Sequence, residues 1–301
     1  MPTLKPVAEQ VIVITGASSG IGRATAQAAA ARGAKVVLAA RSEEALRDMV
    51  AAIEADGGAA AFVVADVGTR ADVEKVGEMA IARFGRIDTW INNAGVAIYG
   101  RLDEVSERDS RRLFDTNFWG VVNGSLVALP YLRQAGGALI NVGSEVSDAV
   151  IPLQGMYAAS KHAVKGFTDA LRVEIEDVDE APVSITLIQP TAVDTPYPQH
   201  AKNYMDREPK LPTPQIDPAE VAAAILDAAE NPARDVTVGS MAKLNTTVAK
   251  LMPAVGDRLA AAQADRQQYA EPPRNPEGAL FRPSGGGATH GQHGPEAGAR
   301  G

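Results

Sequence analysis

The sequence predicts an α/β protein in which a doubly wound parallel sheet lies between two layers of helices. Short apolar, β-branched segments alternate with helical ones along most of the chain, as in sheets covered on both faces. A glycine-rich turn follows the first of these segments. The chain has 301 residues, 46% of them apolar and 22% charged, so it can bury a sizeable core. One domain of this class is expected.

The first elements set the pattern. Val11–Thr15 is an apolar, β-branched run that stops at a glycine, which predicts a buried strand. Residues 20–32 are rich in alanine and predict a helix, because Gly33 follows where a helix end favours a left-handed residue. Lys35–Ala40 is the second strand, and Ser42 opens a helix with two glutamates in its first turn.

The alternation continues to about residue 240. Later strands are predicted at 61–65, 88–91, 138–142, 183–188 and 236–238. Later helices are predicted at Arg70–Phe84, 106–133, 157–177 and 217–230. Ser106 and Asp109 open the longest helix with a spacing similar to a capping box. Asp217 followed by proline opens the last one.

The remaining segments depart from this rhythm and divide the chain. The main α/β domain is expected to span residues 1–240. Within it, residues 195–216 hold five prolines among polar residues, which predicts a mobile loop rather than part of the core. Residues 241–269 are predicted to form a helical extension interrupted at Pro253. Residues 270–301 are rich in proline and glycine and are expected to be largely disordered.

Composition and charge exclude several classes of function. The net charge of −8 argues against nucleic acid or an anionic membrane surface as partner. The chain has no cysteine, which excludes disulfides, thiolate metal sites and a catalytic cysteine. Its four histidines show no ligand spacing, so no metal site is expected. The start lacks the apolar run of a signal peptide, and no apolar stretch is long enough to span a membrane. A cytoplasmic protein is expected.

The turn after the first strand carries Gly16, Gly20 and Gly22. Residues without a Cβ let backbone N–H groups approach a pyrophosphate at the positive end of the following helix. The spacing Gly-x-x-x-Gly-x-Gly differs from the general dinucleotide fingerprint. A glycine-rich turn without a ligand is the alternative interpretation.

The end of the second strand predicts the choice of cofactor. Enzymes that use NAD place an acidic residue there, and its charge repels a 2′-phosphate. This chain has Ala40 followed by Arg41 and Ser42. The Arg41 guanidinium offers a planar set of donors that matches phosphate, and Ser42 adds a hydroxyl. NADP is therefore favoured over NAD, unless Arg41 is simply a solvated surface residue.

Three residues predict the chemistry. Tyr157 follows Ser144 by thirteen positions, and Lys161 follows Tyr157 by four, one helical turn away on the same face. A free tyrosine, with a pKa of ~10, is a poor base at neutral pH. A nearby ammonium group and a nicotinamide cation favour the phenolate. Tyr157 could then take a proton from an alcohol, or give one to a carbonyl oxygen.

Together these motifs resemble the short-chain dehydrogenase/reductase family, a Rossmann-type fold, over about residues 11–239. The resemblance implies that Tyr157 is the general acid/base and that Ser144 stabilises the substrate oxygen. Lys161 would lower the pKa of Tyr157 and hold the nicotinamide ribose. Asn117 would anchor a water that links Lys161 to solvent, with a helix-packing role as the alternative.

The resemblance also implies a set of cofactor contacts along the sheet edge. They are Gly16, Ser18, Ser19, Gly20, Ile21, Gly22, Arg41, Ser42, Asp66, Val67, Asn93, Ala94, Gly95, Tyr157, Lys161, Pro190, Val193 and Thr195. Asp66 and Val67 correspond to the adenine contact. The chain departs from the family at Thr191, where glycine is usual, and at Gly143, where serine is frequent.

The predicted function is hydride transfer between NADP(H) and a carbonyl or secondary alcohol on a small, hydrophobic molecule. An isomerase or dehydratase on the same scaffold, and an NADPH-sensing regulator without turnover, are the alternatives. Glu145 could instead select a polar group. The family implies a homodimer or homotetramer through the two long helices, where Phe118 and Trp119 lie. The residues expected to line the substrate pocket are largely apolar: Ile98, Tyr99, Val146, Ile151, Leu153 and Met156.

Overall fold

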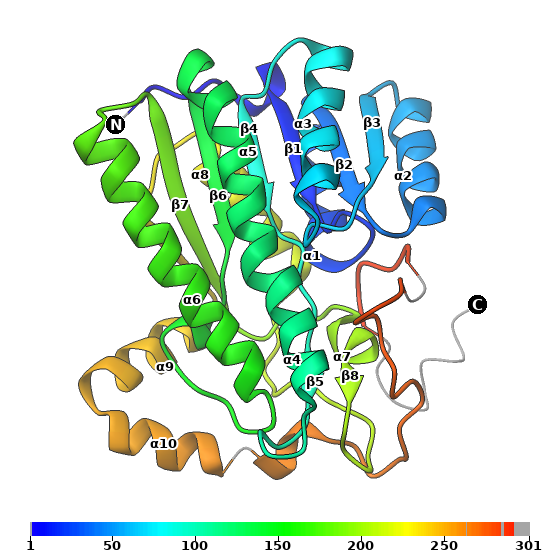
Figure 1. The fold of residues 1–301 in the computed structure, drawn as a ribbon, viewed down its shortest axis with the longest axis vertical. Coiled ribbons are helices and arrows are strands. Elements are labelled where there is room, and N and C mark those ends of the chain that lie inside the picture. The colour runs from blue at the N-terminus through cyan, green and yellow to red at the C-terminus, as the bar shows by residue number, and fades with distance from the viewer. Residues whose placement is uncertain (1, 263, 284–285, 292–301) are drawn as a thin grey trace.

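The computed structural model describes residues 2–262, 264–283 and 286–291 (Figure 1). Its main feature is a seven-stranded parallel sheet in the order β3-β2-β1-β4-β6-β7-β9. The strands are β1 (Val11–Thr15), β2 (Lys35–Ala40), β3 (Ala59–Val64), β4 (Thr89–Asn92), β6 (Gly137–Val142), β7 (Val183–Pro190) and β9 (Asp235–Val238). The strand order reverses between β1 and β4, as in a doubly wound sheet. The predicted fold class is confirmed.

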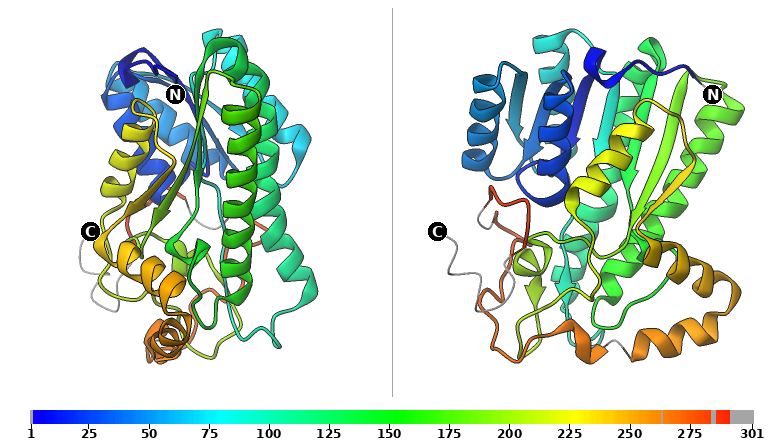
Figure 2. Two further views of the ribbon diagram at one scale, coloured as in Figure 1. Left: turned by 90° about the vertical axis from the view of Figure 1, so that its left-hand side faces the viewer. Right: turned by 180° about the vertical axis from the view of Figure 1, so that it is seen from behind.

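Helices cover both faces of the sheet and make three layers (Figure 2). One face carries α1 (Gly20–Ala31), α2 (Glu43–Ala55) and α8 (Pro218–Ala228). The other carries α3 (Arg70–Phe84), α5 (Gly120–Ala135) and α6 (Gly155–Arg172). Successive strand residues point to opposite faces, so Ile12 and Ile14 of β1 belong to one core and Val13 to the other. The strands and helices that were predicted up to residue 240 lie within two residues of their predicted bounds, if the π-helical residues 173–178 are counted as the end of α6.

The helix predicted at 106–133 is continuous but contains a π-helical turn. It runs through α4 (Glu107–Phe114), the π-turn η2 (Asp115–Trp119) and α5. The side chain of Ser106 accepts a hydrogen bond from the backbone N–H of Asp109 at 3.2 Å, which confirms the predicted cap. A second π-turn, η4 (Val173–Val178), extends α6. Turns of this kind are frequent at functional sites, and Asn117 lies in the first.

The proline-rich segment 195–216 contains regular structure. It forms α7 (Tyr197–His200) and the short strand β8 (Lys202–Asn203), which pairs in parallel with β5 (Ile98–Tyr99). Ala201 is buried with Tyr99 in a small apolar cluster. The expectation that this segment lies outside the core is therefore wrong for these residues. The β5–β8 pairing joins positions about 100 residues apart, so nothing local in the sequence indicates it.

The chain after residue 240 packs along one end of the domain. It forms α9 (Ser240–Leu251), α10 (Pro253–Ala261) and a 3-10 turn, η5 (Ala264–Gln267). Pro253 is the first residue of α10, a position at which the missing N–H costs nothing. Two further 3-10 turns are η1 (Val7–Glu9) and η3 (Glu145–Ser147).

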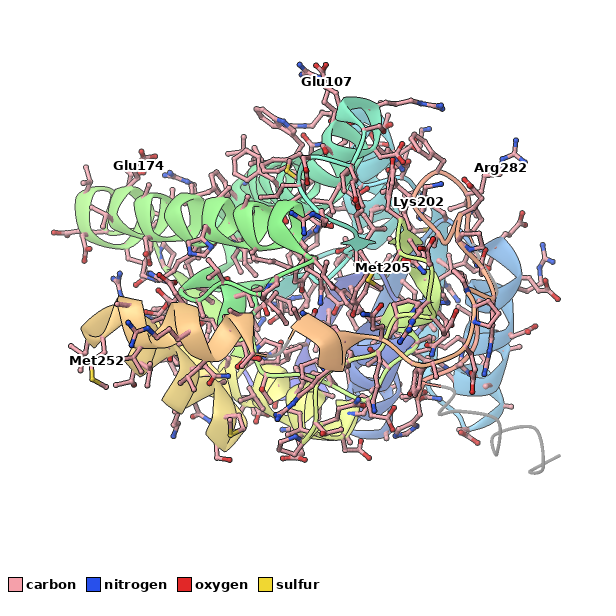
Figure 3. The ribbon with its side chains drawn as sticks, turned by 90° about the horizontal axis from the view of Figure 1, so that it is seen from below. Glu107, Glu174, Lys202, Met205, Met252 and Arg282 are labelled. Carbon is pink, nitrogen blue, oxygen red and sulfur yellow. The ribbon has the colours of Figure 1, made fainter. Side chains whose placement is uncertain are left out.

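Residues 270–301, which were expected to be largely disordered, are described only in part. Residues 284–285 and 292–301 lie outside the described residues. The described part of this stretch packs against the domain, because Leu280 is fully buried beside Val96, Ile98 and Leu113. The segment carrying Arg282 also runs beside the strand that carries Lys202 (Figure 3). Leu280 thus anchors a segment whose composition predicted disorder.

Candidate active site

A cavity of about 260 Å³ lies at the carboxyl ends of the central strands, where the strand order reverses. Such crevices hold ligands in open α/β sheets. All the predicted catalytic and cofactor-binding residues line this cavity except Gly22 and Asn117. The wall residues that sequence reasoning missed include Gln154, Tyr197, His200, Ala279 and Pro283.

The glycine turn is as tightly built as its sequence predicts. Gly16 has φ of +68°, and a Cβ there would lie 2.6 Å from the Cα of Ala94. A Cβ on Gly22 would lie 2.3 Å from the carbonyl oxygen of Gly16, so Gly22 lets α1 approach the turn from behind. The side-chain amide of Asn93 donates to the carbonyl oxygens of Thr15 and Gly16 at 3.0 and 3.2 Å. Asn93 therefore fastens the turn.

Two arginines gather beside Asp66, at the ends of β2 and β3. The Asp66 carboxylate accepts from the backbone N–H of Gly68 at 3.0 Å and from the Arg112 guanidinium. Arg41 donates to the carbonyl oxygens of Ala279 and Leu280. Arg112 donates to the same Leu280 oxygen at 3.1 Å. The arginine predicted to read the cofactor is thus held by the C-terminal segment.

The same segment then crosses the glycine turn. The backbone N–H of Gly287 donates to the carbonyl oxygen of Ser18 at 2.9 Å. The N–H of Gly20, in the first turn of α1, donates to the carbonyl oxygen of Ala288 at 3.0 Å. Further on, Gly291 donates to the Asp194 carboxylate at 3.1 Å. The C-terminal segment, defined here as residues 279–283 and 286–291, therefore forms one wall of the nucleotide end.

The reacting end is built from the loop after β6 and the start of α6. The Ser144 hydroxyl lies close enough to the Tyr157 hydroxyl to lower its pKa. The Ser144 hydroxyl also accepts from the backbone N–H of Val146 at 3.3 Å, as the cap of η3. A Cβ on Gly143 would lie 2.9 Å from the hydroxyl oxygen of Ser147, which accepts from the N–H of Ser144. Glycine at 143 therefore leaves room for the residue that shapes this loop.

Burial controls the protonation of both residues on α6. It raises the pKa of Tyr157 to about 12, against the opposing effect of the nearby Ser144 and Tyr197 hydroxyl groups. It lowers the pKa of Lys161 to about 8. The Lys161 ammonium donates to the carbonyl oxygen of Val142 at 2.8 Å and lies 5.7 Å from the centre of the Tyr157 ring. At neutral pH the protein's own groups thus keep Tyr157 protonated, the state of a general acid.

Asn117 lies behind the cavity wall. Its side chain accepts from the N–H of Val96 at 2.8 Å and donates to the Val96 carbonyl at 3.0 Å. It also donates to the hydroxyl of Ser160 at 3.1 Å. Asn117 therefore ties the loop after β4 to the helix that carries Tyr157 and Lys161.

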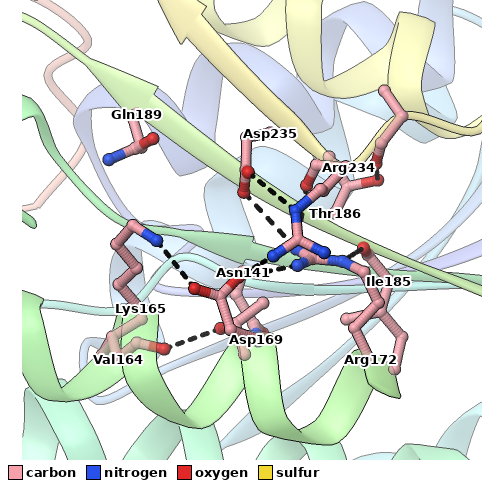
Figure 4. A network of polar contacts seen from close by, with 12 residues as sticks. Asn141, Val164, Lys165, Asp169, Arg172, Ile185, Thr186, Gln189, Arg234 and Asp235 are labelled. Atoms are coloured by element: carbon pink, nitrogen blue, oxygen red, sulfur yellow. Dashed lines mark hydrogen bonds and ion pairs between the residues drawn. The ribbon is translucent and has the colours of Figure 1, made fainter. Parts of the chain in front are cut away.

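The far end of α6 is anchored by a buried arginine (Figure 4). Arg172 donates to the carbonyl oxygens of Ile185 and Arg234 at 2.8 and 2.9 Å, and to the Asp169 carboxylate at 2.7 Å. These contacts hold α6 against β7 and the start of β9. Charge-assisted hydrogen bonds are the stronger ones in proteins, so they fix the helix and with it Tyr157.

Glu145 and Thr191 lie together on the substrate side. Thr191 donates from its hydroxyl to Glu145 at 3.2 Å, and Asn245 of α9 donates to the other carboxylate oxygen at 2.9 Å. Burial raises the pKa of Glu145. Threonine in place of the family's glycine thus supplies a partner for a buried carboxyl group.

The substrate-pocket predictions are partly wrong. Val146 and Ile151 line the cavity. Ile98, Tyr99, Leu153 and Met156 do not, and the first two are fully buried behind it because β5 pairs with β8.

No cluster of three metal-ligating side chains occurs among residues 2–262, 264–283 and 286–291. Within those same limits, no helix is long and apolar enough to cross a bilayer.

Comparison with known proteins gives consistent matches. The sequence model described as short chain dehydrogenase matches residues 10–205. A Bacillus subtilis protein named uncharacterized oxidoreductase YxnA is 48% identical over 283 residues, which cover 92% of this chain and 79% of that protein. That match extends well beyond the residues that the family model covers.

Solved structures share the fold. A short-chain dehydrogenase/reductase from Burkholderia phymatum, in complex with NAD, superposes with a TM-score of 0.72 and 28% identity, covering 89% of this chain and 98% of that one. An alcohol dehydrogenase from the archaeon Thermococcus sibiricus, complexed with 5-hydroxy-NADP, has a TM-score of 0.67 and 28% identity, covering 76% and 94%. Structures similar to this chain thus hold both forms of the nicotinamide cofactor.

Proposed function

Because the chain belongs to the short-chain dehydrogenase/reductase family, we propose that it transfers a hydride between NADP(H) and a carbonyl or secondary alcohol on a small, hydrophobic molecule. Membership makes it an oxidoreductase with a Rossmann-type nucleotide-binding fold. The observation that carries the proposal is that Ser144, Tyr157 and Lys161 line the same cavity as the glycine turn, with the Ser144 hydroxyl near that of Tyr157.

The residues present fit a dinucleotide. Gly16 lines the cavity and has no room for a side chain, while Gly22 lets α1 pack closely behind the turn. The turn leads into the N-terminus of α1, where backbone N–H groups favour a phosphate. The N–H of Gly20 donates to Ala288 in this structure, so a phosphate would replace Ala288 as its acceptor. Ser18, Ser19, Gly20 and Ile21 would hold the pyrophosphate there. Asp66 and Val67 would meet the adenine, and Pro190, Val193 and Thr195 the nicotinamide side.

The chemistry then follows from the chain's own groups. The nicotinamide supplies or accepts the hydride. During reduction Tyr157 donates its proton to the carbonyl oxygen, and Ser144 donates a hydrogen bond to the same oxygen as negative charge develops. Lys161 holds the ribose hydroxyls and contributes positive charge near the phenolate that Tyr157 becomes. Asn117 would anchor the water through which a proton passes between Lys161 and solvent.

NADP rather than NAD is proposed on the charge at the ends of β2 and β3. No acidic residue stands at the end of β2, which Arg41 and Ser42 follow directly, and the Asp66 carboxylate is paired with Arg112 rather than with Arg41. Arg41 therefore remains the group suited to a 2′-phosphate, together with the hydroxyl of Ser42.

The experiment is NADPH consumption by the purified protein across a panel of ketones and aldehydes, with Tyr157→Phe beside it. We expect turnover that the substitution removes. Tight NADPH binding without reduction of any carbonyl would favour the sensing alternative. Conversion of an alcohol or sugar without net change in NADPH would favour the isomerase or dehydratase alternative.

We also propose a homodimer or homotetramer assembled through α5 and α6. Exposed large apolar side chains lie on α5 and on the π-turns that adjoin the two helices: Trp119 (51% exposed), Leu126 (41%), Val173 (46%) and Val178 (72%). Patches of this kind mark interaction surfaces. Sedimentation equilibrium tests the assembly. The cytoplasmic location predicted from the sequence stays a prediction.

A further inference from the structure

Tyr197 of α7 shares the reacting end with Tyr157. Their ring centres lie 5.4 Å apart at an interplanar angle of 68°, and their hydroxyl groups are close enough to affect each other's pKa. Both residues line the cavity. The β5–β8 pairing brings Tyr197 here, since it fixes the segment that follows α7 against the sheet end.

The hydroxyl of Tyr197 has one proton, which it can donate either to Gln154 or to the oxygen of Tyr157. A hydroxyl donates one hydrogen bond and accepts two. Tyr197 Oη lies 2.8 Å from the side-chain oxygen of Gln154, to which it donates. Gln154 donates in turn to Gln267 at 2.8 Å, and Gln267 to the carbonyl oxygen of Pro152 at 2.8 Å. A chain of buried amides thus holds the Tyr197 hydroxyl beside Tyr157.

We propose that Tyr197 is a positioning residue that donates a hydrogen bond to the Tyr157 phenolate and so sets the pH above which Tyr157 acts as a base. This proposal rests on the proposed function. When Tyr157 carries its proton, Tyr197 donates to Gln154. When Tyr157 loses its proton, the hydroxyl of Tyr197 turns to the phenolate oxygen, and Gln154 loses one neutral hydrogen bond.

Ser144 cannot replace this donor during the reaction. The hydroxyl of Ser144 has a single proton, and the substrate oxygen needs it as charge develops there. Tyr197 has no such second duty in the proposed mechanism. A hydrogen bond to a buried phenolate is charge-assisted and therefore stronger than the one to Gln154 that it replaces.

Other charged and titratable groups also face Tyr157. Lys161 lies on the same helix, Glu145 on η3, Tyr99 on β5 and His200 on α7. Glu145, when ionised, disfavours the phenolate, and the Lys161 ammonium favours it. The test must therefore change the Tyr197 hydroxyl alone.

Tyr197→Phe removes that hydroxyl and keeps the ring. The measurement is the pH dependence of kcat for alcohol oxidation with NADP⁺. We expect the pKa of the ascending limb to rise by about 1 to 2 units, the value of one hydrogen bond to a charged group. Tyr99→Phe is the matched control, because the Tyr99 hydroxyl is buried without a hydrogen bond of good geometry, and its ring lies 6.5 Å from that of Tyr197. It should leave this pKa unchanged.

A packing role makes the opposite prediction. If Tyr197 only supports the ring of Tyr157, Tyr197→Phe leaves the pKa where it is, whatever happens to the rate. That result overturns the proposal. An equal shift in Tyr99→Phe would also overturn it, because the effect would then belong to the cluster and not to one hydroxyl.

A second readout does not depend on turnover. The six tyrosines are replaced by 3-fluorotyrosine, and their ¹⁹F resonances are followed from neutral to alkaline pH. The Tyr157 resonance is identified by its loss in Tyr157→Phe. A higher pKa for this resonance in Tyr197→Phe supports the proposal even if no substrate is ever turned over. An unchanged pKa refutes it, while the proposed function remains open to the carbonyl panel.

Discussion

The two ends of the cavity are assembled in different ways. The reacting end takes Ser144, Tyr157 and Lys161 from one loop and one helix, within eighteen consecutive positions. The nucleotide end takes Ser18 and Arg41 from the start of the chain and closes them with Ala279–Leu280 and Gly287–Ala288 from its other end. Local geometry therefore secures the chemistry, whereas a contact between distant parts of the chain completes the nucleotide end.

The largest effect on activity is expected from a substitution that changes the reacting end and leaves the nucleotide end intact. Tyr157→Phe removes the proton donor without touching the glycine turn. We expect kcat to fall by about 10²- to 10⁴-fold, with the Kd for NADPH within about threefold of wild type, because the nucleotide contacts persist. Steady-state kinetics and fluorescence titration measure the two quantities. A parallel loss of NADPH affinity would mean that the ends are not independent.

Lys161, at the reacting end, should make the stability of the folded protein depend on pH, an effect not expected from the nucleotide end. Burial lowers the pKa of Lys161 from 10.5 to about 8, so between these values the unfolded chain binds the proton and the folded chain does not. Stability therefore rises with pH across this window, by about 3 kcal/mol at most. Below pH 8 the ammonium is charged in both states, and its burial cost persists.

Urea unfolding at several pH values from 7 to 10.5 checks this expectation. Lys161→Met is the control, because it has no proton to release and should lack the rise. Equal pH dependence in both proteins would show that the lysine is solvated.

Arg41→Ala should weaken the nucleotide end selectively. The substitution removes the donors suited to a 2′-phosphate, so we expect NADPH binding to weaken by about 10- to 100-fold. NADH lacks that phosphate, and its Kd should change by no more than about threefold. Calorimetry with both cofactors separates the outcomes. Equal losses for the two would assign the effect to release of the C-terminal segment, which Arg41 also holds.

The smallest effect is expected from loosening the C-terminal wall itself. Leu280→Ala removes the one fully buried side chain that anchors the segment. NADPH should dissociate a few-fold faster, measured by stopped-flow displacement, because part of the wall is lost. Phe281→Ala is the control, since Phe281 is 41% exposed and contacts Arg108 instead. Slower dissociation or tighter binding in Leu280→Ala would mean that the segment competes with the nucleotide.

The same contrast explains what the sequence could predict. The sequence predicted features that depend on residues near one another in the chain. These are the strands and helices, the glycine turn, and the spacing of Ser144, Tyr157 and Lys161. The structure places these three residues in one cavity with the glycine turn. Composition correctly indicated the interruption at Pro253, because proline acts locally.

What escaped prediction depends on pairing over long distances. Tyr197 reaches Tyr157 only because β8 adds to β5, and these two-residue strands carry no periodic pattern. The same pairing buries Tyr99, which was expected in the pocket wall. The C-terminal segment has the composition of a disordered tail, and its one buried leucine is too weak a signal to overrule that composition. Asn117 matched a motif, but its side-chain contacts with Val96 and Ser160 appear only in the folded chain.

The buried Gln267 has a consequence for heat inactivation. It ties the C-terminal extension to Gln154 at the reacting end, and Leu280, thirteen residues later, ties the same stretch to the nucleotide end. Such a peripheral stretch can open locally without unfolding the sheet. Activity should therefore disappear on heating before the sheet melts, so that the working lifetime of the enzyme is set by how long this stretch stays closed.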